Sequence, residues 1–248
     1  IEILFEINNK GIKLIKVSKW CEKYLNRYPS ELIKLNDILE GVFSYDEYSF
    51  KARIKRIGEF FLFLFLLIPA IPILLIAGCL IKFEDGGPIF YSQIRNGFEG
   101  KYIKIIKLRT MIVNAESNGI QWSQKFDNRI TKVGSILRKL RIDELPQLFL
   151  VLSGDMSLIG PRPERPSIDK FLKKEISNYD LRYTIKPGIS GWAQVNYPYG
   201  ASIKDSKYKL SYDLYYIKNF SIFLDCLILL KTMKIVFNGK GSKPIEFQ

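Results

Sequence analysis

Two adjacent carboxylates, Asp143 and Glu144, lie in a stretch of chain that is dense in cationic side chains. A carboxylate binds Mg²⁺ through hard oxygen ligands, and an aspartate can attack phosphorus to form an acyl phosphate. Its neighbour can then act as a base or as a second metal contact. Adjacent acids are more often a solvated helix start, here with Pro146 in the first turn, but the surrounding cations favour phosphate and metal chemistry. Those cations are Arg138, Lys139, Arg141, Arg162 and Arg165.

Arg162 is the strongest candidate for a phosphate contact. Pro161 and Pro163 flank it, and two prolines force an extended, stiff loop that holds the guanidinium in place. A guanidinium fixed in this way suits bidentate binding of phosphate, although a structural ion pair explains it equally well. Weaker candidates for polar contacts lie upstream on a predicted hairpin, namely Gln93, Arg95, Lys107 and Arg109.

The charge of the chain points to anionic partners. Of the formal net charge of +13, residues 1–50 contribute about −1 and the remainder about +14. A basic body of this kind suits nucleic acid, anionic lipid or a phosphorylated substrate. The chain contains no histidine, which excludes His-based catalytic triads and His-ligated metals. Its three cysteines are too far apart for a disulfide framework or a zinc site, so we expect a reducing, cytosolic environment.

A long uncharged run, Phe60 to Ile81, predicts a helix in contact with a membrane. Its 22 residues are enough for a straight helix to cross roughly 30 Å of hydrocarbon. Pro69 and Pro72 near its middle predict a sharp kink. Basic residues flank the run on both sides, so the positive-inside rule gives no direction of crossing. A spanning helix and a re-entrant helix, which bends and returns to the same face, are equally supported on these grounds.

The rest of the chain is predicted to be a mixture of helices, one hairpin and polar connections. Its first residues have the pattern of an element's interior, so we expect the chain to be the C-terminal part of a longer one. Four clustered tyrosines near residue 212 are predicted to pack in the core or at an interface. The predicted elements are a strand at Ile12–Val17, a helix from Ser18 to about Asn26, a polar connector at Tyr28–Phe50, a hairpin of Ile89–Arg95 and Lys101–Arg109 around Asn96-Gly97, a short helix at Thr131–Arg141 with Val133, Ile136, Leu137 and Leu140 on its apolar face, and an amphipathic helix at Ser211–Phe237.

A series of short motifs runs in order through the chain from about residue 51 to residue 240. They are Lys55-Arg56, Gly87-Pro88, Gln93-x-Arg95-x-Gly97, Lys107-x-Arg109-Thr110-Met111, Asp127-x-Arg129-Ile130-Thr131, Asp143-Glu144-Leu145-Pro146-Gln147, Gly154-Asp155-Met156-Ser157, Gly160-Pro161-Arg162-Pro163 and Lys186-Pro187-Gly188-Ile189-Ser190-Gly191-Trp192-Ala193-Gln194-Val195. The series resembles the bacterial sugar transferase family, the monotopic polyprenyl-phosphate phosphoglycosyl transferases. Segments 196–202 and 212–217 resemble its exopolysaccharide-type branch. Glu59, Ile68 and Leu150 depart from the family pattern, and none of them is a candidate catalytic group.

The resemblance implies an α+β fold in three parts. Residues 83–248 would form a mostly helical catalytic domain with a small β-hairpin. Residues 51–82 would be a basic flank and a re-entrant membrane helix, kinked at Pro69 and Pro72. Residues 1–50 would be the C-terminal remnant of a Rossmann-like α/β domain with its linker.

The resemblance also implies transfer of a sugar-1-phosphate from a UDP-sugar to undecaprenyl phosphate, with release of UMP, at the start of exopolysaccharide or O-antigen assembly. In that reaction Asp143 is the nucleophile that forms a covalent phosphosugar intermediate, with Mg²⁺ bound to it, and Glu144 assists. Membrane lipid is a further implied partner, nucleic acid is not, and a homodimer is left open. The implied location is the cytoplasmic face of the bacterial inner membrane. The implied phosphate-binding residues are Arg138, Arg162, Lys107, Arg109, Arg95 and Gln147.

A different class of function remains compatible with the charge pattern. A non-enzymatic, basic membrane-surface module would bind anionic lipid or nucleic acid in a salt-sensitive way, without any dependence on Asp143. P-loop, dinucleotide-binding, zinc and protein-kinase motifs are absent from the sequence, as is the Asp-x-Asp pattern of many glycosyltransferases. Glucose, galactose and N-acetylated sugars are equally compatible with the sequence.

Overall fold

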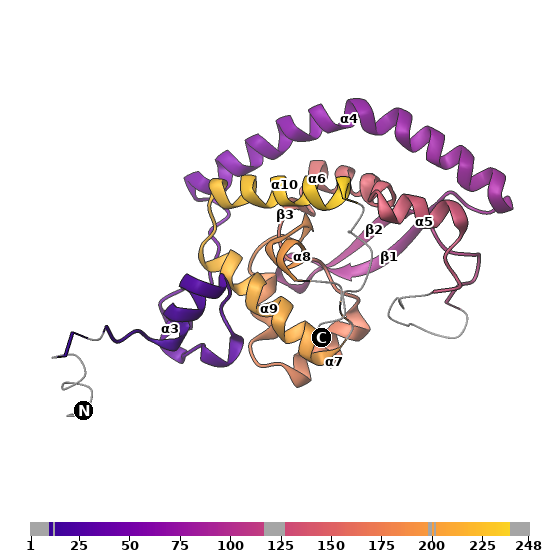
Figure 1. The fold of residues 1–248 in the computed structure, drawn as a ribbon. Helices are drawn as coiled ribbons and strands as arrows, with labels where there is room; N and C mark the ends of the chain where they lie inside the picture. The colour runs from indigo at the N-terminus through magenta and orange to yellow at the C-terminus, as the bar shows by residue number, and fades with distance from the viewer. Residues whose placement is uncertain (1–9, 12, 117–126, 198–199, 201, 239–248) are drawn as a thin grey trace.

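The computed structural model of the chain describes residues 10–11, 13–116, 127–197, 200 and 202–238. Figure 1 shows one long helix, α4, that arches over a body made of the other elements. In chain order the described elements are α2 (Val17–Trp20), a π-helical turn (Cys21–Leu25), a 3₁₀ turn (Ser30–Leu32), α3 (Leu35–Leu39), α4 (Phe50–Asp85), β1 (Phe90–Asn96), a 3₁₀ turn (Phe98–Gly100), β2 (Tyr102–Leu108), α5 (Lys132–Lys139), the 3₁₀ segment η4 (Ile142–Gln147), α6 (Leu148–Ser153), β3 (Ser157–Ile159), α7 (Pro166–Glu175), the 3₁₀ segment η5 (Tyr179–Tyr183), β4 (Gly188–Ser190), α8 (Trp192–Asn196), α9 (Ile203–Lys218) and α10 (Ile222–Phe237).

Helix α4 is capped at both ends and continuous between them. The Ser49 hydroxyl begins it by accepting a hydrogen bond from the Ala52 amide at 3.3 Å, and Gly86 ends it with a φ of 71°. The helix runs through both Pro69 and Pro72. In Figure 1 it bows, with its convex side away from the body, as expected where prolines remove backbone donors. The predicted kink therefore takes the form of a continuous bow.

The outer side of α4 is apolar and uncovered. Among the described residues, α4 is the one helix that is long and apolar enough to cross a membrane, and 17% of its most apolar window is buried. The core helix of a soluble protein would be mostly buried. The exposed large apolar side chains of α4 are Phe50, Ile54, Ile57, Phe60, Phe61, Leu64, Phe65, Ile68, Ile71, Ile73, Leu75, Ile76, Leu80 and Phe83.

A buried ionic network fixes the N-terminal part of α4 to the body. Lys55 Nζ donates to the Ile159 carbonyl and to the Tyr216 hydroxyl, both at 2.8 Å, and lies 3.2 Å from the Asp225 carboxylate. One turn later, Glu59 accepts a hydrogen bond from a β3 amide at 2.9 Å. The partners belong to β3, α9 and α10, so this network joins three elements of the body to the long helix.

The last turn of α4 is fixed in a similar way. The Asp85 carboxylate pairs with the guanidinium of Arg109, just after β2, through two hydrogen bonds, one of them 2.8 Å long. A Cβ at Gly87 would collide with that guanidinium, so glycine leaves it the space it needs. Glu84 accepts a hydrogen bond from the Val133 amide near the start of α5 at 3.2 Å. Both ends of α4 are therefore tied to the body.

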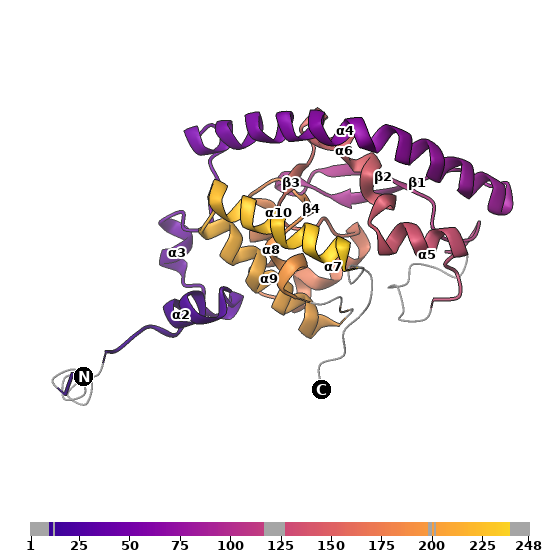
Figure 2. The ribbon, with the colours of Figure 1, turned by 45° about the horizontal axis from the view of Figure 1, so that its top comes forward.

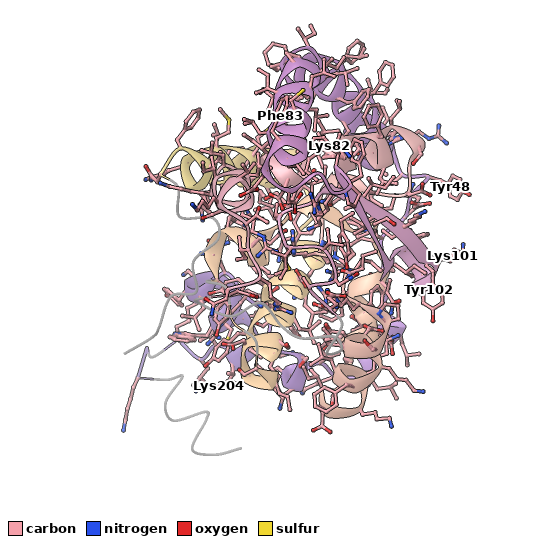
Figure 3. The ribbon with its side chains drawn as sticks, turned by 90° about the vertical axis from the view of Figure 1, so that its right-hand side faces the viewer. Tyr48, Lys82, Phe83, Lys101, Tyr102 and Lys204 are labelled. Carbon is pink, nitrogen blue, oxygen red and sulfur yellow. The ribbon has the colours of Figure 1, made fainter. Side chains whose placement is uncertain are left out.

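The hairpin predicted from the sequence is confirmed. Strands β1 and β2 pair antiparallel, with Phe90 opposite Leu108. The turn is longer than the predicted Asn96-Gly97 turn, because the chain closes through a 3₁₀ turn at Phe98–Gly100. Figure 3 shows Lys101 and Tyr102 at this tip, pointing outward from the body, and Tyr102 is 71% exposed.

The main hydrophobic core includes aromatic residues from the N-terminal segment. Tyr28 and Phe43 are 3% and 2% exposed, and their rings meet edge to face with centroids 5.2 Å apart. The polar connector predicted at Tyr28–Phe50 therefore packs in the same core as α9. Tyr216 of α9 is 1% exposed in this core, which agrees with the packing predicted for the clustered tyrosines.

The prediction of one helix over Ser211–Phe237 is wrong, because the segment is divided between α9 and α10. The break lies at residues 219–221, where the Ser221 hydroxyl accepts from the Leu224 amide at 3.2 Å and begins α10. Apolar residues continue across the break, so hydrophobic spacing alone did not reveal it. Figure 2 shows α9 and α10 crossing the front of the body below α4.

The strand predicted at Ile12–Val17 is wrong over its described residues, where Val17 begins α2, and two helix predictions hold in part. Residues 13–16 of the predicted strand Ile12–Val17 form no strand, because no described strand pairs with them, and Ile12 lies outside the described residues. The helix predicted from Ser18 is present as α2 and the π-helical turn that follows it. Helix α5 forms as predicted, but Ile136 and Leu140 of its apolar stripe are 60% and 42% exposed, since the helix packs through a narrower face.

Lys55→Met is expected to lower the free energy of unfolding by about 3–5 kcal/mol, because it leaves the buried Asp225 carboxylate without its cation. Lys51→Met, at an exposed position one turn earlier, is the matched control and is expected to stay within about 0.5 kcal/mol of wild type. Denaturant titration in detergent measures both values. Equal stability of the two variants would contradict the role of Lys55 in fixing α4.

Candidate active site

The acidic pair lies in η4, between α5 and α6. Arg141, just before η4, adopts a left-handed conformation with a φ of 59°, which turns the chain sharply out of α5. Pro146 tolerates a position near the start of a helix because it needs no amide partner there. Asp143 and Glu144 are 7% and 6% exposed, so they are not a solvated helix start.

Three cations hold the Glu144 carboxylate. Lys107 Nζ lies 2.9 Å from Oε1, Arg141 Nη1 lies 3.1 Å from Oε2, and Arg162 reaches both oxygens, at 2.5 and 3.4 Å. We call these four residues the Glu144 cluster. Burial by itself would raise the pKa of Glu144, but Arg162, Lys107 and Arg141 together hold it well below its usual range. Glu144 is therefore ionised at neutral pH.

Asp143 differs from its neighbour. Its carboxylate forms no hydrogen bond, and no ion pair within 4 Å, with any residue that the structure describes. Burial and the charge of Glu144 raise its pKa to about 6, against the opposing effect of Lys107 and two arginines. An ionised carboxylate that is buried and unpaired is suited to be a nucleophile or a metal ligand.

Strand β2 places Lys107 in the cluster. Side chains alternate along a strand, so Ile103, Ile105 and Lys107 share one face, and Ile105 is 3% exposed. This face packs against η4. Burial lowers the pKa of Lys107, although the nearby Glu144 opposes that shift.

Helix α5 places Arg138. Gly134 packs so closely against Thr110 that a Cβ there would collide with the Thr110 carbonyl. One turn later, Arg138 Nε donates to the Thr110 hydroxyl at 2.8 Å. The positive charge of Arg138 is near enough to lower the pKa of Asp143. Arg138 therefore adds a positive charge near the Asp143 carboxylate.

The loop that carries Arg162 packs backbone to backbone against β4. Strands β3 and β4 pair in parallel, and the Gly160 amide donates to the Ser190 carbonyl at 2.9 Å. A Cβ at Gly160, Gly188 or Gly191 would collide with the facing backbone. The glycines of two distant motifs therefore form one unit that supports Arg162.

Four of the predicted phosphate-binding residues lie outside the Glu144 cluster: Arg138, described above, and Arg109, Arg95 and Gln147. Arg109 pairs with the last turn of α4. Arg95 donates to the Pro163 carbonyl at 3.2 Å and pairs with Glu164 at 3.2 Å, so it contacts the loop that carries Arg162. Gln147 is 2% exposed, and its amide nitrogen has no partner in the part of the chain that is described. Their phosphate contacts stay predictions.

Sequence reasoning missed Arg182. Its side chain is buried, and Nη2 donates to the carbonyl of Arg162 at 2.8 Å. A single arginine between Leu181 and Tyr183 gives no sequence signal for this contact, because the partner is a backbone carbonyl 20 residues away.

The residues present fit Mg²⁺ together with a phosphorylated substrate. Within the described ranges, no three acidic or thiol side chains gather as a metal site. Glu144 is occupied by its cations, so Asp143 is the carboxylate of the pair that could bind a metal. Mg²⁺ is commonly held by one or two carboxylates and by the phosphates of a substrate. The donor set therefore suits a metal whose other ligands come from the substrate.

Comparison with known proteins decides the family. The model of the bacterial sugar transferase family matches residues 50–239, which is more than half of the chain. The chain belongs to the bacterial sugar transferase family. The matched range contains α4, the acidic pair and the whole Glu144 cluster, so these features of the sugar transferase lie within the family's common part.

Several relatives of this sugar transferase carry informative names. It is 49% identical over 173 residues to the UDP-N-acetylgalactosamine-undecaprenyl-phosphate N-acetylgalactosaminephosphotransferase of Aeromonas hydrophila, covering 69% of this chain and 41% of the relative. It is 40% identical over 191 residues to the UDP-glucose:undecaprenyl-phosphate glucose-1-phosphate transferase of Klebsiella pneumoniae, covering 76% and 40%. It is 37% identical over 188 residues to the uncharacterized sugar transferase EpsL of Bacillus subtilis, covering 76% and 89%. The chain thus spans about two fifths of the first two relatives.

Asp143→Asn is expected to stabilise the sugar transferase at pH 8 but not at pH 4. In the folded state the pKa of Asp143 is raised from 3.8 to about 6. The protonated carboxyl therefore makes its full contribution to stability below the unfolded pKa of 3.8, and this contribution is lost as the pH rises to about 6. Asparagine removes the resulting penalty above pH 6, roughly 1–3 kcal/mol. Denaturant titration at both pH values measures the change, with Asp46→Asn, at an exposed aspartate, as control. An Asp143→Asn variant that is less stable than wild type at pH 8 would contradict the burial argument.

Proposed function

We propose that the protein transfers a sugar-1-phosphate from a UDP-sugar to undecaprenyl phosphate and releases UMP. The observation that carries the proposal is the buried Asp143 carboxylate, which has no hydrogen-bond or ion-pair partner among the described residues, beside the three cations of the Glu144 cluster. An unpaired nucleophile next to concentrated positive charge suits attack on a polyanionic phosphate ester. The names of the two curated relatives support this substrate class. They differ in the sugar, N-acetylgalactosamine in one and glucose in the other.

In the first step, Asp143 attacks the phosphorus that carries the sugar. A bond forms between a carboxylate oxygen and that phosphorus, the phosphoanhydride bond breaks, and UMP leaves with the bonding electrons. A pKa of about 6 leaves Asp143 mostly ionised at neutral pH. No described residue donates a hydrogen bond to this carboxylate, so its lone pairs are available for the attack.

In the second step, a phosphate oxygen of undecaprenyl phosphate attacks the same phosphorus, and the aspartyl bond breaks. Both attacking groups are anions already, so neither step needs a proton to be removed. This agrees with the low pKa of Glu144, which makes it a poor base. We assign Glu144 the task of holding Lys107, Arg141 and Arg162 where substrate phosphates bind. The covalent intermediate also means that the soluble and the lipid substrate need not occupy the site together.

Mg²⁺ belongs to the same proposal. Asp143 and the phosphates of the bound UDP-sugar would hold the ion, and when bound it neutralises charge on the leaving phosphate. Arg138, Arg162 and Lys107 would bind the remaining phosphate oxygens through charge-assisted hydrogen bonds. Arg162 would then share its two nitrogens between Glu144 and a substrate phosphate.

We further propose that α4 is re-entrant and that the body lies on the cytoplasmic face of the inner membrane. The apolar outer side of α4 supports contact with lipid, and its bow toward the body at both ends supports a return to the same face (Figure 1). Helix α10 contacts the start of α4 through Asp225 and Lys55. It also carries two exposed aromatic side chains, Phe223 and Phe237, each 81% exposed.

The complete protein, supplied with undecaprenyl phosphate and Mg²⁺, is expected to release UMP from a UDP-sugar, and a chelator is expected to stop the release. Asp143→Asn should lower the rate by roughly 10⁴-fold or more, as expected for loss of a covalent nucleophile. Asp46→Asn serves as the matched control and should keep wild-type turnover. A screen of UDP-sugars with UMP detection measures the reaction and names the sugar.

Two results would count against this function. Wild-type turnover in Asp143→Asn would exclude Asp143 as the nucleophile. Salt-sensitive binding to anionic vesicles, without UMP release from any UDP-sugar, would favour the non-enzymatic membrane-surface module instead.

Both flanks of α4 are expected to lie on the cytoplasmic side. Lys51→Cys and Lys82→Cys, introduced singly where the three natural cysteines have been replaced by serine, place a thiol at each end of the apolar run. A membrane-impermeant maleimide should label both variants in inverted vesicles and neither in intact spheroplasts. Labelling of the two positions from opposite faces would mean that α4 spans the membrane.

A further inference from the structure

The loop of residues 161–164 is held at each of its four backbone carbonyls. Two of its residues are prolines, which have no amide to donate, so the carbonyls are its main means of attachment. The donors come from three different elements, β1, η5 and β4. In the order of the carbonyls, they are Gly188 N at 2.9 Å, Arg182 Nη2 at 2.8 Å, Arg95 Nη1 at 3.2 Å and Asn96 N at 2.9 Å.

Arg182 is a buried cation that needs an explanation. It is 7% exposed, its Nη2 lies 3.0 Å from the carboxylate of Asp213 in α9, and its Nη1 donates to the Tyr179 hydroxyl. A buried ion pair contributes little net stability compared with apolar side chains of the same volume. The hydrogen bond from Arg182 to the Arg162 carbonyl gives the Arg182–Asp213 pair a role other than stabilising the fold.

The hydrogen bond from Arg182 to the Arg162 carbonyl sets the direction of the Arg162 side chain, which pairs with Glu144. The carbonyl and the guanidinium of Arg162 share one Cα, so fixing the carbonyl sets the direction in which the side chain leaves the loop. That side chain is 39% exposed and reaches both oxygens of Glu144. A long, partly exposed arginine has many alternative rotamers. A fixed backbone reduces their number and so favours the rotamer that reaches Glu144.

We propose that Arg182, held by Asp213, is a positioning residue that fixes Arg162 against Glu144. Arg182 acts through the loop backbone, and its charge is satisfied by Asp213. The effect of Arg182 on turnover rests on the proposed function, whereas its effect on the order of loop 161–164 does not. Arg182 sits in η5 and Asp213 in α9, so the proposal extends the site to two elements that contribute nothing to the Glu144 cluster.

Hydrogen–deuterium exchange tests the effect on the loop without turnover. The peptide covering residues 160–166 is expected to exchange about tenfold faster in Arg182→Gln and in Asp213→Asn, because the loop loses one of its four attachments. Tyr179→Phe removes the hydrogen bond between the same guanidinium and the Tyr179 hydroxyl and is the matched control, with unchanged exchange in this peptide. Arg182→Lys keeps a donor for the carbonyl and should restore slower exchange. Unchanged exchange in Arg182→Gln or in Asp213→Asn would overturn the proposal.

UMP release tests the effect on catalysis. Arg182→Gln is expected to lower kcat/KM for the UDP-sugar about 10- to 100-fold, because a small misplacement of a substrate-positioning group is costly. It should change kcat and KM in the same proportions as Arg162→Ala does. In an Arg162→Ala background, Arg182→Gln should have less than about a twofold further effect, since it acts through Arg162.

The possible outcomes separate the two proposals. A full additional effect of Arg182→Gln in the Arg162→Ala background would show that Arg182 acts by another route, and would overturn its positioning role. A wild-type protein that releases no UMP would overturn the proposed function, while the exchange result still decides the positioning. If Arg182→Gln does not fold, the exchange of Arg182→Lys and of Asp213→Asn decides it, with Tyr179→Phe as reference.

Discussion

One carboxylate, that of Glu144, allows three cations to share a buried site. Lys107, Arg141 and Arg162 come from different parts of the chain and would repel one another if their anion were removed. The same arrangement divides the acidic pair. Glu144 is held ionised, while Asp143, buried beside a fixed negative charge, has a raised pKa and no partner among the described residues. The proposed nucleophile and the proposed phosphate-binding site thus arise from the same constraint.

The attachments of α4 lead directly to this cluster. Lys55, near the start of α4, holds Ile159, and the chain runs from Ile159 through Gly160 into the loop that carries Arg162. Asp85, at the other end, holds Arg109, two residues after Lys107. The long helix is therefore joined to two of the segments that bring cations to Glu144, those of Lys107 and Arg162. If α4 rests in the membrane as proposed, these joints fix the site at a set distance from the lipid surface.

The sequence predicted the parts of the structure that depend on local chemistry. The hairpin was predicted from the Asn96-Gly97 turn and α5 from its apolar spacing, and both elements are present. The acidic pair could be recognised because cations surround it in the sequence as well as in space. The break between α9 and α10 was missed, since a single capping serine interrupts an apolar pattern that continues on both sides.

Features that depend on groups distant in the chain could not be predicted. Arg109 pairs with the Asp85 side chain 24 residues away, a contact that the sequence did not reveal, while its phosphate contact stays a prediction. Arg182 meets a carbonyl, and a carbonyl has no sequence signature. Gly160 and Gly188 are separated in the chain, and the backbone contact between them becomes evident only once β3 and β4 are paired.

The central claim is that Asp143 carries the sugar-1-phosphate between the two substrates. The most direct test is to mix the complete protein with a UDP-sugar and Mg²⁺ without undecaprenyl phosphate, quench it in acid, and map its peptides by mass spectrometry. We expect a mass increase of one sugar-1-phosphate on Asp143, which disappears when undecaprenyl phosphate is added before the quench. The same mass increase on another residue, or in the Asp143→Asn variant, would contradict it.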